Sequence, residues 1–242
     1  DGTSTVNEYQ GFIDTVVQEV IDKTGNNPYS VPMDIYTTMV KSKQDVINNF
    51  YKTYKFKDNK IEVGVGVVDN KTGAIIAVGA GRYKKSAMTL NMATFSGQTP
   101  RAGGSTMKPI LDYGPAIEYA GLSTYGPFID EKTSYAGGYM RNHNGKNAGF
   151  MTMRDCLKNS VNTCALQAFR LTSNDEKYKF ATSLGIKFDS TYLPDSYSIG
   201  TFNAITPVTL AGAFAAFGNG GYYSEPHSFT KLVYRETDET YE

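Results

Sequence analysis

The sequence has few of the residues on which many functional sites depend. Its 242 residues include two histidines, two cysteines and no tryptophan, and 24 basic side chains balance 24 acidic ones. A chain without net charge has no strong field to attract nucleic acid or an anionic membrane. With only His143 and His227, a histidine-based metal site is not expected, and a Ser-His-Asp triad has no motif to support it. We expect no metal, no cofactor and no nucleic-acid partner.

Long apolar runs are also missing, and the cysteines are placed unfavourably for pairing. No run of about 18 apolar residues occurs, so the sequence predicts no membrane-spanning helix within these residues. Cys156 and Cys164 lie in a stretch with mainly helical spacing. If that helix is continuous, the two residues are about 12 Å apart along its axis, which is too far for a disulfide. The favoured interpretation is two small buried apolar side chains.

The first 57 residues differ in pattern from the rest of the chain. Apolar positions at helical spacing predict a helix over residues 6–23, and Gly25 is a residue type suited to its C-cap. A short strand over 33–38 and a second helix over 41–54 come next. We interpret residues 1–57 as a linker or appendage without chemistry of its own, which precedes a domain over residues 58–242.

Residues 61–81 contain the clearest strand pattern. Two runs rich in valine and isoleucine flank the turn-forming residues 69–73, which predicts an antiparallel hairpin. The polar residues 82–99 then lead to a predicted helix that begins near Ser105. A sheet that delivers the chain to a helix indicates an α+β domain. The positions expected to be buried along that helix are Met107, Ile110, Leu111, Gly114, Ile117 and Ala120.

The start of this helix carries a serine and a lysine, Ser105 and Lys108, three positions apart. This spacing places both on the same side of the first helical turn. A serine hydroxyl is a poor nucleophile until a base removes its proton, and a lysine with a lowered pKa is such a base. Two glycines before the serine allow a sharp turn. The S-x-x-K pattern alone is common, and the alternative is an ordinary capped helix.

A second polar group occurs further along the chain. Thr152 and Asp155 have the spacing of a capping box that opens a short helix. Ser160 and Asn162 come next, and polar side chains of this kind interrupt helices by competing for backbone hydrogen bonds. We expect both residues in an exposed connection between two helices. Alone, this pattern is that of an ordinary helix–helix turn.

Together, S-x-x-K followed by S-x-N resembles the motif set of penicillin-recognising serine enzymes. The resemblance is to the transpeptidase domain of class A, bifunctional penicillin-binding proteins of Gram-positive type, and it runs from about Ile61 to the C-terminus. It implies an α+β fold, with an antiparallel sheet flanked by helices and an all-helical subdomain, here incomplete at its C-terminus. It also implies that residues 1–57 join this domain to an upstream glycosyltransferase. Further matching segments are residues 91–93, 101, 118–119, 130, 149–162, 205–211 and 215–221.

The resemblance implies a role for each of four residues. Ser105 would be the acylated nucleophile and Lys108 the base that activates it. Ser160 would relay a proton to the leaving amine, and Asn162 would hold the substrate's amide and help to fix the lysine. The implied substrate is the D-Ala-D-Ala end of a peptidoglycan stem peptide, and β-lactams would acylate the same serine. The implied location is outside the cytoplasm, with a membrane anchor that these residues do not include.

One part of the family pattern is missing after Asn162. The third motif, K-[ST]-G, belongs to the strand that walls the cleft opposite the helix. Here it occurs only at residues 23–25 and 71–73, where it is typical of a helix end and a hairpin turn. The strand should contribute a positive charge that lowers the lysine pKa and a second oxyanion donor. We therefore expect a domain cut or nicked near Glu242, with its remainder supplied as a second chain.

The same two motifs are compatible with other functions. A class A β-lactamase needs a glutamate after S-x-N to activate the deacylating water, and no glutamate occurs between Glu176 and Glu225. Antibiotic hydrolysis is therefore disfavoured. Two alternatives stay open. One is a penicillin-sensing receptor or scaffold without turnover, and the other is a D,D-carboxypeptidase, in which only the acceptor differs.

Overall fold

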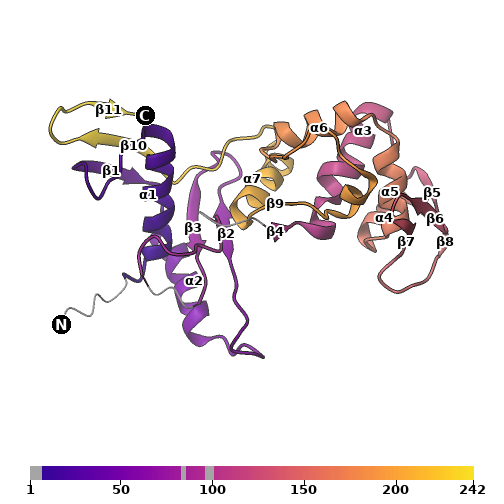
Figure 1. Ribbon diagram of the computed structural model, residues 1–242, viewed down its shortest axis with the longest axis horizontal. Coiled ribbons are helices and arrows are strands. Elements are labelled where there is room, and N and C mark those ends of the chain that lie inside the picture. Colours follow the sequence, from indigo (N-terminus) through magenta and orange to yellow (C-terminus); the bar gives the residue numbers. More distant parts are fainter. Residues whose placement is uncertain (1–6, 83–85, 96–100) are drawn as a thin grey trace. The chain divides into compact units, whose positions relative to one another are not determined.

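The computed structural model describes residues 7–82, 86–95 and 101–242. Its chain forms two compact units: the first comprises Asp1–Pro100 and Thr206–Glu242, and the second comprises Arg101–Ile205. Figure 1 shows the helices and strands in chain order. All four predicted site residues belong to the second unit. Within the described ranges, no helix combines the length and the apolar character needed to cross a membrane.

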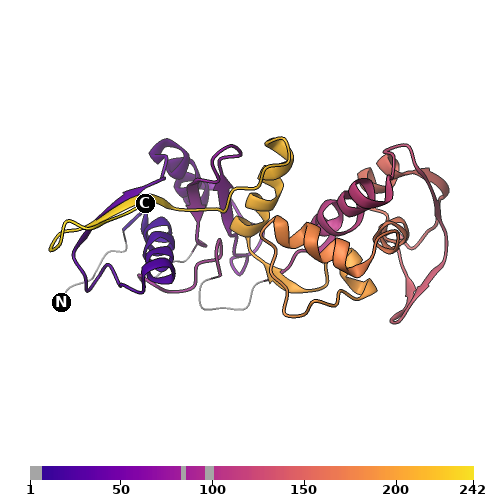
Figure 2. The ribbon, with the colours of Figure 1, turned by 90° about the horizontal axis from the view of Figure 1, so that it is seen from above.

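The first unit is built on antiparallel strands. A three-stranded sheet has the order β1 (Met33–Thr37), β10 (Phe229–Tyr234), β11 (Thr240–Tyr241), and β2 (Val65–Val68) pairs with β3 (Ile75–Gly79). Figures 1 and 2 show the indigo β1 beside the yellow β10, so segments from opposite ends of the sequence are neighbours. The predicted hairpin over residues 61–81 is confirmed by the β2–β3 pair.

Three helices pack on these strands: α1 (Gln10–Thr24) and α2 (Lys41–Thr53) against β3, and α7 (Pro207–Gly218) against β2. Gly25 ends α1 in the left-handed conformation, with φ of 74°, and its N–H donates to the Ile21 carbonyl, as predicted for a C-cap. The boundary predicted at residue 57 stays a prediction. The buried cluster that α1 shares with the strands consists of Phe12, Val16, Val20, Ile75, Val78, Ala93, Val208, Phe229 and Leu232.

A buried glutamine completes the hydrogen bonding of β3. The side chain of Gln44, on α2, is 2% exposed. Its Nε2 donates to the Val78 carbonyl at 2.7 Å, and its Oε1 accepts from the Val78 N–H at 2.8 Å. The amide thus pairs with the backbone as a neighbouring strand would, and two buried backbone groups are satisfied without another strand.

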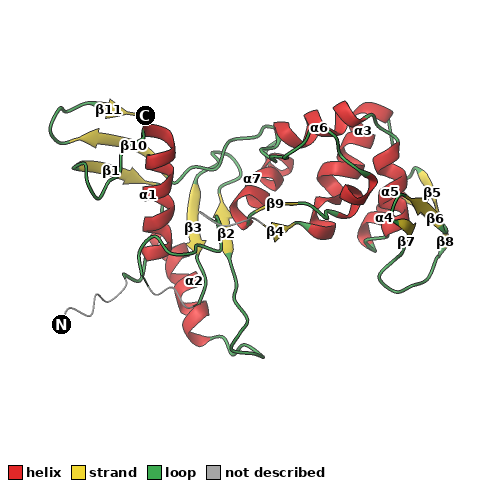
Figure 3. Cartoon of the chain, in the orientation of Figure 1, coloured by secondary structure: helices red, strands yellow, loops and turns green. Residues whose placement is uncertain are grey.

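The second unit is mainly helical and carries three short antiparallel ladders, whereas the resemblance implied an all-helical subdomain (Figure 3). Its α-helices are α3 (Gly114–Ala120), α4 (Met153–Lys158), α5 (Asn162–Arg170) and α6 (Asn174–Ser183). Its ladders pair β4 (Arg101–Ala102) with β9 (Asn203–Ile205), β5 (Pro127–Asp130) with β8 (Gly149–Thr152), and β6 (Thr133–Tyr135) with β7 (Gly138–Met140).

The segment that carries Ser105 is not one uniform helix. It consists of the 3₁₀-helix η1 (Gly104–Met107), the π-helix η2 (Pro109–Tyr113) and then α3. A π-turn takes more residues than an α-turn, so the buried positions expected from α-helical spacing do not hold along this segment. Ile110 and Leu111 are buried as predicted, but Ile117 is 44% exposed and Ala116 takes its place in the core. Ala120, also predicted to be buried, is exposed.

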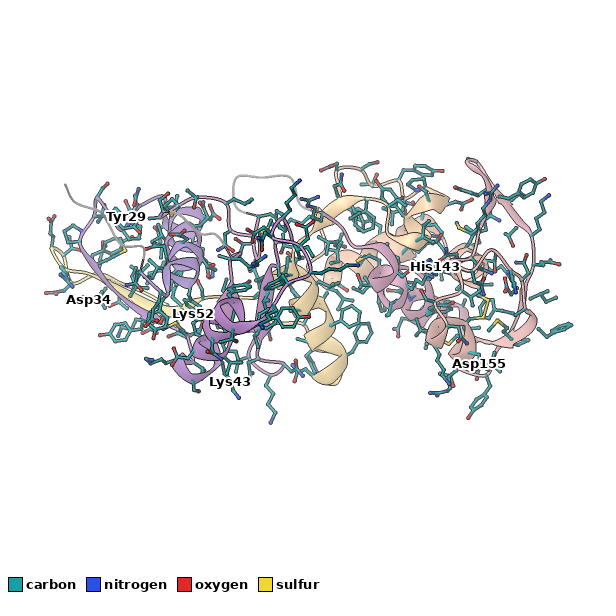
Figure 4. The ribbon with its side chains drawn as sticks, turned by 90° about the horizontal axis from the view of Figure 1, so that it is seen from below. Tyr29, Asp34, Lys43, Lys52, His143 and Asp155 are labelled. Atoms are coloured by element: carbon teal, nitrogen blue, oxygen red, sulfur yellow. A yellow bond between two sulfur atoms is a disulfide. The ribbon has the colours of Figure 1, made fainter. Side chains whose placement is uncertain are left out.

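The two cysteines form a disulfide, so the prediction of unpaired cysteines was wrong. The prediction assumed a continuous helix, but α4 ends at Lys158 and α5 begins at Asn162. Ser160, in the turn between them, has a positive φ of 52°. This reversal brings the two Cα atoms to 6.0 Å. Figure 4 labels Asp155, the residue next to Cys156 on α4.

Candidate active site

Ser105 lies within η1, immediately after a glycine in the left-handed conformation. Gly104 has a φ of 56°, and its N–H donates to the Gly200 carbonyl at 3.0 Å. A Cβ added at Gly200 would lie 2.6 Å from the Gly104 nitrogen, so the two backbones meet where no side chain fits. The β4–β9 ladder anchors the chain just before this point. The backbone that leads into the serine is therefore held in place.

The alternative that Ser105 is only a helix cap is not supported by its contacts. The residue before η1 is Gly103, and the hydroxyl that donates to its carbonyl, at 2.6 Å, belongs to Thr106. Ser105 is exposed, and its hydroxyl makes no hydrogen bond to any residue that the structure describes. A hydroxyl in this position is accessible to a substrate.

Lys108, by contrast, is fully buried at 0% exposure. Its Nζ lies 2.8 Å from the Ser160 carbonyl oxygen, 3.1 Å from Ser160 Oγ and 2.7 Å from Asn162 Oδ1. The structure thus brings together three of the four predicted site residues, from the end of η1 and the turn before α5. Burial disfavours the charged ammonium and lowers the pKa of Lys108 from 10.5 to about 8, although Asp112 opposes this change.

The three acceptors around Lys108 are not equivalent. A neutral amine has two N–H donors and one lone pair, whereas the ammonium has three donors. The Ser160 carbonyl and Asn162 Oδ1 only accept, so they take the two donors of the neutral form. Ser160 Oγ is a hydroxyl and is the one neighbour of the three that can donate in return. The cluster therefore accommodates both protonation states of Lys108 without losing a hydrogen bond.

A buried carboxyl group lies one helical turn after the lysine. Asp112, in η2, is fully buried, and neither of its carboxyl oxygens has a hydrogen-bond partner among the described residues. Burial raises its pKa well above the usual value, against the opposing charges of Lys108 and Lys177. A neutral carboxyl group at this position stabilises the charged form of Lys108 less than a carboxylate would.

The motif patterns did not identify Asp112 or the residues that support the S-x-N turn. Asp112 is four positions after Lys108, a spacing that places it on the same helical side, and this is the signal that identifies it. Asn142 contacts the start of α5 from a distant loop, so no local pattern marks it. Asp130 was part of the resemblance but had no assigned role.

Comparisons with known proteins identify the family to which the chain belongs. The family described as "Penicillin binding protein transpeptidase domain" matches residues 63–242. Penicillin-binding protein 1A/1B of Bacillus subtilis is 37% identical over 236 residues, which cover 95% of this chain and 25% of that protein. Penicillin-binding protein 1A of Streptococcus pneumoniae is 29% identical over 252 residues, covering 97% and 35%. The chain therefore spans about a quarter to a third of these relatives.

Solved structures share the fold at low sequence identity. The PonA1 protein of Mycobacterium tuberculosis, solved in complex with penicillin V, has a TM-score of 0.80 and 17% identity, covering 94% of this chain and 63% of that one. Penicillin-binding protein 1A of Haemophilus influenzae has a TM-score of 0.70 and 18% identity, covering 96% and 49%. The α+β fold with helices and antiparallel strands is that of these proteins. With the family match over most of its length, the chain belongs to the penicillin-binding protein transpeptidase domain family.

Proposed function

We propose that this chain supplies the acyl-enzyme machinery of a D,D-transpeptidase that cross-links peptidoglycan and is acylated by β-lactams. The observation that carries the proposal is the contact of the buried Lys108 amine with both polar residues of the S-x-N motif, three positions from an exposed serine. Family membership and the penicillin bound to a structural relative support it.

In the proposed reaction, neutral Lys108 accepts the Ser105 proton as Ser105 Oγ attacks the carbonyl carbon of the penultimate D-alanine. The tetrahedral intermediate collapses, the peptide bond to the last D-alanine breaks, and Ser160 relays the proton to the departing amine. An ester on Ser105 remains, with Asn162 holding the substrate's amide. An acceptor amine then attacks the ester carbonyl, forms the new amide and returns a proton to Ser105 Oγ. A β-lactam undergoes only the first half, because its leaving amine stays attached.

The proposal has finer parts that concern the whole protein. The substrate is the D-Ala-D-Ala end of a stem peptide, and the location is outside the cytoplasm on a membrane anchor. Residues 1–57 connect the domain to an upstream glycosyltransferase. A second chain carries K-[ST]-G and completes the cleft, and activity requires it. Its lysine would add positive charge near Lys108 and lower the pKa of that amine further.

Intact-mass spectrometry with and without a slowly hydrolysed β-lactam, followed by peptide mapping, tests this proposal. We expect one adduct, located on the peptide that contains Ser105, and a co-purifying polypeptide with K-[ST]-G. Stem peptide with an acceptor amine then separates the alternatives, because a transpeptidase forms a cross-link, a carboxypeptidase releases D-alanine to water, and a sensor stays acylated. A folded preparation without an adduct would refute the proposal. An adduct on this chain alone would refute the second-chain part.

The rate constant for β-lactam acylation is expected to rise with pH, with its midpoint at about pH 8, and then to level off. The proton acceptor is the neutral form of Lys108, whose pKa burial lowers to about 8. Labelling by a fluorescent penicillin across this pH range measures the midpoint. A rate that keeps rising towards pH 10.5, the ordinary lysine value, would contradict the assignment.

The same pKa change affects folding stability. The pKa of Lys108 is lower in the folded than in the unfolded chain, so the unfolded chain binds more protons between pH 8 and pH 10.5. The contribution of Lys108 to the free energy of unfolding therefore increases with pH across this window.

A further inference from the structure

The N-terminus of α5 lacks a capping side chain of its own. The first backbone N–H groups of a helix have no partner within the helix, and a polar side chain at the N-cap usually accepts from them. Here the N-cap is Val161, whose side chain makes no cap hydrogen bond. The helix begins at Asn162, the residue that contacts Lys108. The stability of this first turn therefore determines where Asn162 lies.

Asn142 provides the missing cap from another part of the chain. Its Oδ1 accepts from the Asn162 N–H at 2.9 Å and from the Thr163 N–H at 3.4 Å. The neighbouring Arg141 carbonyl accepts from Asn162 Nδ2 at 2.7 Å. The side-chain amide of Asn162 is thus held at both ends, by Arg141 through its nitrogen and by Lys108 through its oxygen.

Asp130 fixes the orientation of the Asn142 amide. This carboxylate is 3% exposed. Its Oδ1 accepts from Asn142 Nδ2 at 2.8 Å, from Asn147 Nδ2 at 2.9 Å and from Thr163 Oγ1, and its Oδ2 accepts from the Ala148 N–H at 2.7 Å. Burial opposes the charge, but the hydrogen bonds outweigh it and lower the pKa of Asp130. Because the amide nitrogen of Asn142 faces this anion, its oxygen must face α5.

These contacts form a continuous path from a buried anion to the catalytic amine. We propose that Asn142 is a positioning residue, which caps α5 from the preceding loop and thereby holds Asn162 against Lys108, with Asp130 orienting its amide. The inference rests on the proposed function for its kinetic consequences. The structural part of the inference is that Asn142 fixes the position of Asn162 against Lys108. This part does not depend on the proposed function. Asn142 acts through Asn162 and takes no part in the bond changes.

A cavity borders the contacts of Asn142 on the side that faces solvent. A cavity of about 520 Å³ is lined by Asp130, Asn142, Ser160 and Val161, together with residues of the loop that contains His143, which Figure 4 labels. Truncation of Asn142 would widen this cavity towards the start of α5. Water would then reach the N–H groups and the surroundings of Lys108, and the amine would lose part of its burial.

The test compares Asn142→Ala with the unsubstituted protein, with each substitution made in the complete protein together with any polypeptide that co-purifies. We expect the rate constant for β-lactam acylation of Ser105 to fall about 10- to 100-fold, because small displacements of reacting groups cost this much. The dissociation constant of the preceding noncovalent complex should change less. Competitive labelling of lysines with acetic anhydride, read by mass spectrometry, should show the pKa of Lys108 rising towards 10.5.

Two further variants make the comparison decisive. Asn144→Ala is the matched control, because Asn144 is in the same loop and its Oδ1 accepts only from the Lys146 N–H, at 3.0 Å, among the described residues. It should acylate at close to the unsubstituted rate. Asn142→Leu keeps the branched shape and the number of heavy atoms of the side chain but has no acceptor, so it should repeat the loss even if the alanine variant does not fold.

The outcomes separate the two proposals. Acylation and a Lys108 pKa close to the unsubstituted values in Asn142→Leu would overturn the positioning role, as would an equal loss in Asn144→Ala. If the unsubstituted protein is not acylated at all, the proposed function fails. The labelling of Lys108 in the variants then still decides whether Asn142 controls the amine.

Discussion

Replacing Lys108 with alanine is expected to lower the rate constant for β-lactam acylation of Ser105 by about 10²- to 10⁴-fold, the usual contribution of a general base. Lys108 takes the Ser105 proton in the proposed reaction, so its removal leaves the serine hydroxyl without the base that activates it. The loss should appear in the acylation step rather than in noncovalent binding. Stopped-flow measurement with a chromogenic β-lactam separates the two steps.

Controls for Lys108 must allow for its burial, because the side chain is 0% exposed and its removal leaves a cavity. Lys108→Met keeps most of the volume without the amine. Lys108→Arg keeps a positive charge but does not release a proton near neutral pH. Both should be as slow as the alanine variant, and Ser105→Ala should give no adduct. Fast acylation in Lys108→Met would show that another group is the base.

Removing the disulfide is expected to lower the free energy of unfolding of the second unit by about 2 to 3 kcal/mol. The bond between Cys156 and Cys164 closes a short loop, and both residues are fully buried. Inside this loop Ser160 adopts a left-handed conformation, which costs about 1 kcal/mol or more for a residue that is not glycine. Without the covalent bond, the turn has less to hold it in that conformation.

The measurement is denaturant unfolding of the protein and of a Cys156→Ala/Cys164→Ala variant, each with and without a reductant. The reductant should destabilise the unsubstituted protein and leave the double variant unchanged. Acylation by a β-lactam should also slow, because Ser160 and Asn162 lie in the same turn. Equal stability of the unsubstituted protein under both conditions would contradict the prediction. Such a bond persists in oxidising surroundings, which agrees with the proposed location outside the cytoplasm.

Features set by neighbouring residues were predictable from the sequence. The β2–β3 hairpin is explained by two apolar runs around a turn, and the end of α1 is explained by Gly25. The break between α4 and α5 was expected from the polar residues Ser160 and Asn162. The S-x-x-K and S-x-N motifs were also recognisable from the sequence, because each consists of a few neighbouring residues at the start of a helix.

The features that escaped prediction depend on geometry between distant residues or on departures from regular helix. After the π-helix η2, Ala116 is buried and Ile117 is exposed, whereas the prediction from periodicity assumed a constant number of residues per turn. The predicted distance between the two cysteines assumed a continuous helix, although a break was expected at Ser160, and this assumption excluded the disulfide. The cap from Asn142 joins a loop to a helix start, and nothing local in the sequence specifies that pairing.

The order in which the two units become complete is set by the β1–β10 pair. The second unit is one uninterrupted segment, Arg101–Ile205, inserted between the two parts of the first. During synthesis from the N-terminus, every residue of the second unit emerges before β10 exists, and β10 is the strand with which β1 pairs among the described residues. Lys108, Ser160 and Asn162 can therefore come together before β10 has been synthesised and the first unit is complete. The contacts between β1 and β10 join residues that are far apart in the sequence, and such contacts form slowly.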